Sequence, residues 1–418
     1  MNHIIQFFRK ELSYFQVLTK DQRVLLLSFV LYSTAAPLLL VFLETFVWRQ
    51  TRDPLLLIEY NVAFPVGIIA TFALNGFLLN YFRIRTLYTL GCIAQALAPL
   101  TFLFFGEGMT SVGYFMFFSL LNGLAGGLYW ANRNTIASHA SQGARRFQFM
   151  SLDSALSTMT SAALPVLIGW CIILGERSGF VHVGVAYRFF GIIGACCLVV
   201  SGIITLWIAE EVHVPIKMKG LFLKAPNRRW QKVRFVEFLS GLVEGASTYF
   251  PVLLILLLIG QENVVGSVQS VTAVLSTAAM YLLGRVIQPR YYIRILTFWF
   301  ALTTIGAVIL GFSYTAWALL VYLAFSAFSI ELRYSTLFTI FFDIVDEEIQ
   351  KSGVNRFVYL LDREFFLGAG RVTILIALAL GYIYFPAETL RFGLLGVILT
   401  QLPLLFTVRS VLQKSNNQ

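Results

Sequence analysis

Long apolar runs recur along nearly the whole chain, and they constrain its fold more than any other feature of the sequence. A helix of roughly 20 apolar residues crosses the hydrocarbon layer of a membrane. We mark twelve such runs, separated by charged or turn-forming residues. Only 12% of the 418 residues are charged and 58% are hydrophobic, so polar side chains are too few to cover a soluble core. The sequence therefore predicts an all-α polytopic membrane protein with twelve transmembrane helices.

The runs divide into two groups of six around the one long polar stretch, residues 210–234. The first group comprises residues 24–48, 57–81, 86–106, 111–138, 147–175 and 187–209. The second comprises residues 235–260, 264–284, 292–312, 315–342, 355–384 and 387–408. Pro215 and Pro226 discourage a continuous helix through the polar stretch. We predict an N-terminal half (24–209), a basic loop (210–234), a C-terminal half (235–408) and a tail (409–418).

The distribution of lysine and arginine predicts the orientation in the membrane. Cytoplasmic segments near the ends of spans carry an excess of basic residues. If both termini are cytoplasmic, most of the 31 basic residues lie on the inner side, and the outer loops hold only Arg49, Arg52, Arg177, Arg188 and Arg391. This asymmetry accounts for the net charge of +10 without nucleic acid, because no soluble face interleaves basic and aromatic residues. We expect a multi-pass protein of the plasma membrane.

Residues 1–23 lack the apolar core and cleavage site of a signal peptide. Apolar residues recur there at helical spacing beside charged ones: Ile4, Ile5, Phe8, Leu12 and Phe15. This pattern predicts an amphipathic helix on the inner membrane surface, with a frayed polar tail as the alternative. The four cysteines show neither metal-ligand nor disulfide spacing, so we expect no metal and no cofactor.

Short sequence repeats relate the two groups of six. The segment "GARRFQFMSLD" (143–153) follows the fourth run, and "GVNRFVYLLD" (353–362) follows the tenth. Upstream, "ANRNT" around Arg133 has a counterpart in "ELRYST" around Arg333. Equivalent positions in two six-span groups indicate duplicated halves of the kind that transporters use.

With these features the chain resembles the major facilitator superfamily of transporters. That family carries a signature after its second helix, in which Gly, Asp and basic residues contribute to a cytoplasmic gate. The segment "NGFLLNYFRIR" (75–85) keeps Gly76, Arg83 and Arg85 but has Asn80 where the family's Asp usually stands. The resemblance implies transport by alternating access and assigns Gly76, Arg83 and Arg85 to the inner gate.

A second resemblance concerns the fifth span. Antiporters of the family often carry a glycine-rich stretch with a proline there, and "SAALPVLIG" (161–169) retains Pro165 and Gly169. This resemblance favours export. The alternative is that Pro165 only kinks a helix whose freed carbonyl finds another partner.

Charged residues inside the predicted spans are candidates for function, because a charge near the bilayer centre costs roughly 2.5 to 3.5 kcal/mol on insertion scales. Arg133 and Asp153 should lie at similar depth on adjacent antiparallel helices, so we predict an ion pair. The same reasoning pairs Arg333 with Asp362 or Glu364. We assign these five residues to an inner gate; a purely structural ring and a lining of the substrate path are the alternatives.

Arg371 falls near the middle of the eleventh span and is the predicted docking point for a carboxylate or phosphate of the substrate. A buried pair with Glu244 is the alternative. Glu237 and Glu244 are seven residues apart and share a helix face, and a buried carboxylate can carry a proton, so we predict that Glu244 couples transport to protons. The predicted substrate cavity also includes a set of aromatic and amide side chains: Trp130, Asn132, Asn134, Tyr249 and Tyr334.

The sequence favours a proton-coupled exporter of a small amphiphilic or organic-anion compound, acting as a monomer. No GxxxxGK[ST] phosphate loop is present, which argues against ATP-driven transport by this chain alone. An HExxH motif and paired aspartates are also absent, so we do not expect an enzyme. Import of a metabolite is the alternative, and a membrane-embedded enzyme or a receptor without transport is more distant.

Overall fold

The computed structural model describes residues 18–41, 43, 47–48, 51–105, 111–140, 146–178, 183–208, 223, 226–259, 264, 267–268, 270–277 and 289–413. The N-terminal part consists of α2 (Lys20–Ala36), the π-helical η1 (Pro37–Val41), α4 (Pro54–Leu78), α5 (Ile84–Phe105), α6 (Val112–Ala140), α7 (Arg146–Arg177) and α8 (Val183–Thr205). The C-terminal part consists of α9 (Arg228–Leu258), the short η4 (Pro289–Tyr291), α11 (Tyr292–Ser313), α12 (Ala316–Ser352), α13 (Arg356–Tyr384), α14 (Pro386–Leu399) and α15 (Leu402–Gln413).

The described residues contain 10 helical spans long and apolar enough to cross a membrane. One of them, Pro386–Gln413, joins α14 and α15. An eleventh predicted span corresponds to the 32-residue helix α7. The remaining one, predicted at 264–284, is helical wherever it is described. The all-helical, polytopic membrane fold is therefore confirmed.

Three predicted segments lie partly outside the described residues. The amphipathic helix predicted at 1–23 is described only from residue 18, and the tail at 409–418 only to residue 413. The polar loop at 210–234 is described at residue 223 and from residue 226 onward.

Side-chain caps show why several helices begin where they do. Thr19 and Gln22 form a reciprocal capping box at the start of α2. The side chains of Asn227, Thr315 and Asn355 accept backbone N–H groups at the first turns of α9, α12 and α13. Between α12 and α13, Gly353 adopts φ 63°, a left-handed conformation that terminates α12 at little steric cost. The polar residues between the spans therefore set the helix boundaries.

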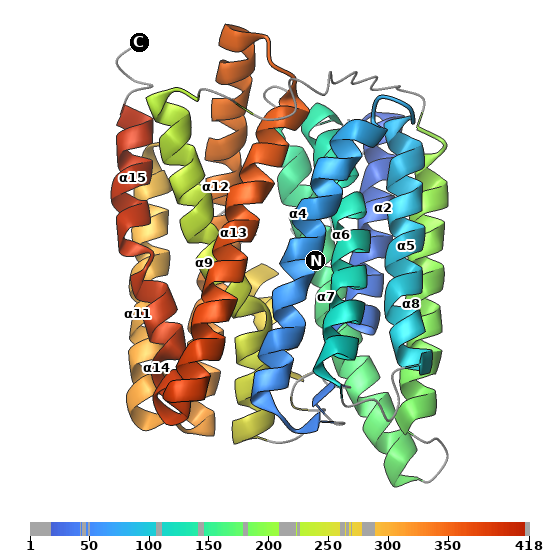
Figure 1. Ribbon diagram of the computed structural model, residues 1–418, viewed down its shortest axis with the longest axis vertical. Coiled ribbons are helices and arrows are strands. Elements are labelled where there is room, and N and C mark those ends of the chain that lie inside the picture. The colour runs from blue at the N-terminus through green and yellow to red at the C-terminus, as the bar shows by residue number, and fades with distance from the viewer. Residues whose placement is uncertain are drawn as a thin grey trace, which may run out of the picture.

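The helices stand side by side in two groups, with the N-terminal helices on the right of Figure 1 and the C-terminal helices on the left. Helices α4 and α13 meet where the two groups adjoin. In this contact the rings of Phe72 and Phe357 stack with centroids 6.0 Å apart. A Cβ at Gly368 would lie 2.5 Å from the side chain of Ile69. The two halves are therefore in direct contact through a pair of helices.

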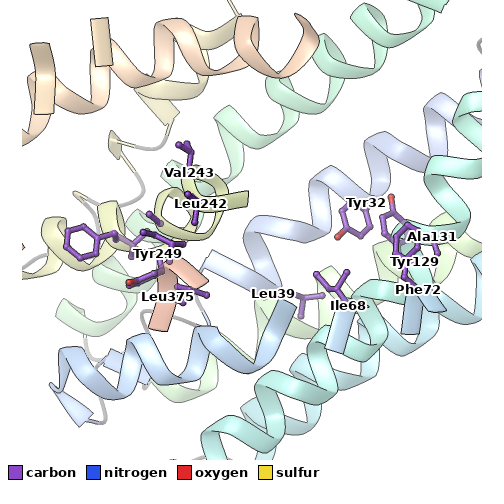
Figure 2. Close-up of a cluster of buried hydrophobic side chains, with 14 of the residues drawn as sticks. Tyr32, Leu39, Ile68, Phe72, Tyr129, Ala131, Leu242, Val243, Tyr249 and Leu375 are labelled. Carbon is purple, nitrogen blue, oxygen red and sulfur yellow. The ribbon is translucent and has the colours of Figure 1, made fainter. Parts of the chain in front are cut away.

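Buried aromatic and polar side chains join the helices of the N-terminal half. The rings of Tyr32 on α2 and Tyr129 on α6 stack with centroids 3.9 Å apart, and Figure 2 shows them side by side. The Tyr32 hydroxyl donates to Gln95 on α5 over 3.0 Å. Ser28 on α2 lies 2.8 Å from both the Tyr88 hydroxyl and Ser201 Oγ. Because membrane helices gain little from the hydrophobic effect, such contacts fix their relative positions.

Candidate functional site

A cavity of about 920 Å³ lies between the two halves of the bundle. Its walls come from α2, α4, α6 and α7 on one side and from α9, α12, α13 and residues 268–276 on the other. Charged side chains lie toward the end at which α6 ends and α13 begins, the upper end in Figure 1. Farther along α9 and α13 the lining becomes apolar, with Pro251, Ile255 and Leu375. The cavity thus has a charged end and, along α9 and α13, an apolar end.

In the N-terminal half, Arg133 on α6 and Asp153 on α7 form the predicted ion pair. Arg133 NH2 lies 2.7 Å from Asp153 Oδ2, and both residues line the cavity. The guanidinium also lies 4.2 Å from the ring centroid of Phe29 and 5.1 Å from that of Trp130. Ser157 Oγ donates to the other carboxylate oxygen, Asp153 Oδ1, over 3.4 Å. The pair thus combines a charge-assisted hydrogen bond with aromatic stacking.

In the C-terminal half, Arg371 on α13 binds two carboxylates. Its Nε and NH2 donate to Glu244 Oε2 on α9 over 3.2 and 2.7 Å. Its NH1 donates to Glu364 Oε1, two helical turns earlier on α13, over 2.8 Å. All three side chains line the cavity. The alternative assignment for Arg371, a pair with Glu244, is therefore the arrangement found.

Close packing of α9 against α13 places this cluster. A Cβ on Gly241 would overlap the carbonyl oxygen of Leu367, and one on Gly370 would overlap that of Phe238. At Gly245, an added Cβ would lie 2.9 Å from the Cα of Arg371. Only glycine allows the two backbones to come this close. The backbone of Arg371 therefore lies directly beside the turn of α9 that carries Glu244.

Arg363 is a cavity residue that the sequence analysis did not single out. Its Nε lies 3.2 Å from Glu237 Oε2, and its guanidinium lies 4.9 Å from the ring centroid of Phe338. The signal was the matched spacing of charges on the two helices: Glu237 and Glu244 are seven residues apart, and Arg363 and Arg371 are eight residues apart. Seven or eight residues are about two helical turns, so each pair shares a face.

The structure brings three of the predicted aromatic and amide residues to the cavity: Trp130, Asn134 and Tyr334. It does not bring Asn132 or Tyr249 there. Asn132 is fully buried and exchanges amide hydrogen bonds of 2.9 and 3.2 Å with Asn75 on α4. Tyr249 is fully buried against Phe250 and lies among other buried side chains of the C-terminal half in Figure 2. Both residues lie on helix faces that contact neighbouring helices.

The predicted pairing of Arg333 with Asp362 or Glu364 is wrong. Asp362 binds Arg234 NH2 over 2.5 Å and Trp230 Nε1 over 2.7 Å, while Glu364 binds Arg371. Arg333 is fully buried, and its guanidinium lies 4.8 Å from the ring centroid of Trp299 on α11. Its side chain is directed toward α11 because of its rotational position on α12, which the sequence pairing did not take into account.

The segment predicted to form an inner gate lies at the end of α4. Gly76 is buried in that helix. Asn80 Nδ2 donates to the carbonyls of Gly76 and Phe77 over 3.4 and 3.2 Å, so it caps the helix end. Arg83 is exposed, and Arg85 NH1 donates to the carbonyl of Ile208 after α8 over 3.1 Å. The role of these residues in a gate stays a prediction.

Comparison with known proteins identifies the family. Residues 24–361 match the family model described as the Major Facilitator Superfamily. The chain is 21% identical over 358 residues to the uncharacterized protein YqgE of Bacillus subtilis (strain 168), covering 84% of this chain and 80% of that protein.

Two solved structures show the same fold. The human organic anion transporter MFSD10 (TETRAN) superposes with a TM-score of 0.66 at 15% identity, covering 93% of this chain and 100% of that chain. The Escherichia coli fucose:proton symporter FucP superposes with a TM-score of 0.64 at 12% identity, covering 93% and 98%. At these identities the likeness concerns the fold alone.

Proposed function

This chain belongs to the major facilitator superfamily, and from that membership we propose that it exports a small amphiphilic or organic-anion compound in exchange for protons. Family and fold make it a multi-pass membrane protein and a secondary transporter of a small molecule. In the proposal it acts as a monomer in the plasma membrane, with both termini in the cytoplasm. The two halves rock around the cavity and expose it alternately to either side.

The observation that carries this proposal is the lining of the cavity. Charged residues of both halves, Arg133 and Asp153 on one side and Glu244, Glu364 and Arg371 on the other, face one space. The same space has an apolar end formed in part by Pro251 and Ile255. A compound with a polar end and an apolar body matches such a lining.

Glu244 is the proposed proton-coupling residue. It lines the cavity on α9 and holds Arg371 of α13, so loss of its negative charge weakens a bond between two helices. Uptake of a proton at Glu244 would therefore alter both the charge of the cavity and the contact between α9 and α13. Such a change is what coupling requires, because the protonated and ionised states then favour different conformations.

The test uses purified protein in vesicles that contain a pH-sensitive dye. A panel of organic anions and amphiphiles is added outside, one compound at a time, and internal pH and compound uptake are recorded together. We expect uptake of a substrate to change the internal pH for the wild type and not for Glu244→Gln. The matched control is Glu348→Gln, which makes the same change at a carboxylate bound to Asn227, outside the cavity lining.

Different outcomes would contradict the proposed coupling ion, the direction of transport or the substrate class. Uptake without a pH change in the wild type would show that protons are not the coupling ion. Higher accumulation of the substrate in cells that overproduce the protein, relative to cells that lack it, would show import. If no compound of either class crosses the vesicle membrane, the proposed substrate class is wrong.

A further inference from the structure

Each of three arginines that line the cavity already has a carboxylate partner. Arg133 pairs with Asp153, Arg363 with Glu237, and Arg371 with Glu244 and Glu364. An anion that binds one of these arginines adds a second negative charge beside its carboxylate partner, and a cation that binds one of these carboxylates competes with the arginine for it, in a poorly solvated site. Leaving a buried charge without its partner is strongly destabilising. The lining therefore offers binding groups for charges of both signs.

The two clusters differ in which member can accept a substrate. Arg133 uses one hydrogen bond to Asp153 among the described residues, and 16% of its side chain is exposed. A guanidinium has several further N–H donors and suits a carboxylate or phosphate. Asp153 keeps the Ser157 hydroxyl when Arg133 turns toward a second anion. On this side of the cavity the group available to a substrate is the guanidinium of Arg133.

On the opposite side the exchangeable group is a carboxylate. Glu364 accepts one hydrogen bond from Arg371, whereas Glu244 accepts two from the same guanidinium. Arg371 can therefore release Glu364 and remain paired with Glu244. The released carboxylate, which lines the cavity, is free to accept a protonated amine.

We propose that the substrate is a zwitterion with an apolar body, whose anionic group binds Arg133 and whose cationic group binds Glu364. Such a molecule supplies an opposite charge to both clusters at once, so no buried charge is left without a partner. It also bridges α6 of the N-terminal half and α13 of the C-terminal half, and these two halves move relative to each other in alternating access. The apolar body lies toward Ile255 and Leu375. This inference rests on the proposed transport function and specifies its substrate class.

The test uses matched compounds on three apolar bodies: phenylalanine, tryptophan and the dipeptide phenylalanylphenylalanine. Each is used as the zwitterion, as the C-terminal amide, which is a cation, and as the N-acetyl form, which is an anion. Binding is measured from the rise in melting temperature of the purified protein as the concentration of each compound increases. We expect zwitterions to bind at least tenfold more tightly than either capped form of the same body.

Two variants test the assignment of the poles. Glu364→Gln should weaken zwitterion binding about tenfold or more and bring the N-acetyl form level with the zwitterion. Arg133→Gln should do the reverse and bring the amide level with the zwitterion. Arg133→Lys keeps the charge and should keep the preference. Arg234→Gln, which breaks an ion pair with Asp362 outside the cavity lining, is the matched control and should leave the preference unchanged.

The inference is overturned if a capped form binds as well as its zwitterion, or if no zwitterion of the three bodies binds. Transport of the binding compounds into vesicles distinguishes this failure from failure of the proposed function. A capped compound that binds as well as its zwitterion and is transported supports the transport function and contradicts the zwitterion as substrate. A zwitterion that binds and is not transported supports the site and contradicts the transport function.

Discussion

Arg371 and Glu244 join α13 to α9 through two hydrogen bonds at the cavity wall, from Nε over 3.2 Å and from NH2 over 2.7 Å. The same guanidinium holds Glu364 at 2.8 Å. One side chain therefore binds carboxylates of two helices. Any change at this position acts on cavity charge and on helix packing together.

Arg371→Met should destabilise the protein by about 3–5 kcal/mol, because it leaves Glu244 and Glu364 together without their cation. Thermal melting of the purified protein in detergent measures the effect. The double variant Glu244→Gln with Arg371→Met should melt at a higher temperature than Arg371→Met alone, because one orphaned charge is removed. Equal melting of wild type and Arg371→Met would contradict the role of this pair in stability.

Arg333→Met should melt at the wild-type temperature or above it. Among the described residues, no acceptor bonds to the Arg333 guanidinium, which is fully buried against Trp299. A buried charge without a hydrogen-bonded partner is costly, and methionine keeps the contact with the ring. The matched control, Arg363→Met, should lower the melting temperature because it leaves Glu237 unpaired in the interior. The prediction fails if the two variants lose stability equally.

Gly370→Ala should destabilise the protein by about 1–3 kcal/mol, because the new methyl group overlaps the Phe238 carbonyl and forces α9 and α13 apart. Gly396→Ala on α14 is the control. A Cβ there meets nothing within 4 Å among the described atoms, so this variant should gain up to roughly 1 kcal/mol from helix propensity. Melting temperatures of the two variants should therefore shift in opposite directions. A shift in the same direction would argue against close packing at Gly370.

Asn132→Ala should lower stability by about 1–3 kcal/mol and leave substrate affinity unchanged, because Asn132 bonds to Asn75 and not to the cavity. Asn134→Ala should weaken substrate binding and leave stability unchanged, since Asn134 lines the cavity. Melting without ligand and ligand-dependent stabilisation separate the two effects. Weaker ligand binding by Asn132→Ala at unchanged stability would indicate that Asn132 contacts the ligand in the cavity.

Several elements of the site follow from the sequence because they depend on depth in the membrane and on helix periodicity. Arg133 and Asp153 lie at similar distances from one end of the bundle on consecutive helices, and the structure pairs them at 2.7 Å. Glu244 and Arg371 likewise lie near the middle of their spans, and they also pair. In each case a buried charge needs an opposite charge at the same depth, and few candidates exist.

Rotational position about the helix axis was not predictable in the same way. Asn132, Arg333 and Tyr249 lie at suitable depth, yet they face neighbouring helices and not the cavity. A transmembrane helix that is apolar all round has no strong amphipathic pattern to show which face turns inward. The sequence therefore predicted the spans that carry these residues but not the face or the partner of each side chain.

That this chain spans a membrane, where its helices run and which charges lie within them all follow from the amino-acid sequence, because the bilayer imposes length, apolarity and satisfied backbone hydrogen bonds on each span separately. Which charges meet and which face the cavity became evident from the folded arrangement of the helices. Those contacts depend on how closely helices such as α9 and α13 approach, and glycines at positions 241 and 370 set that distance through packing between residues far apart in the chain.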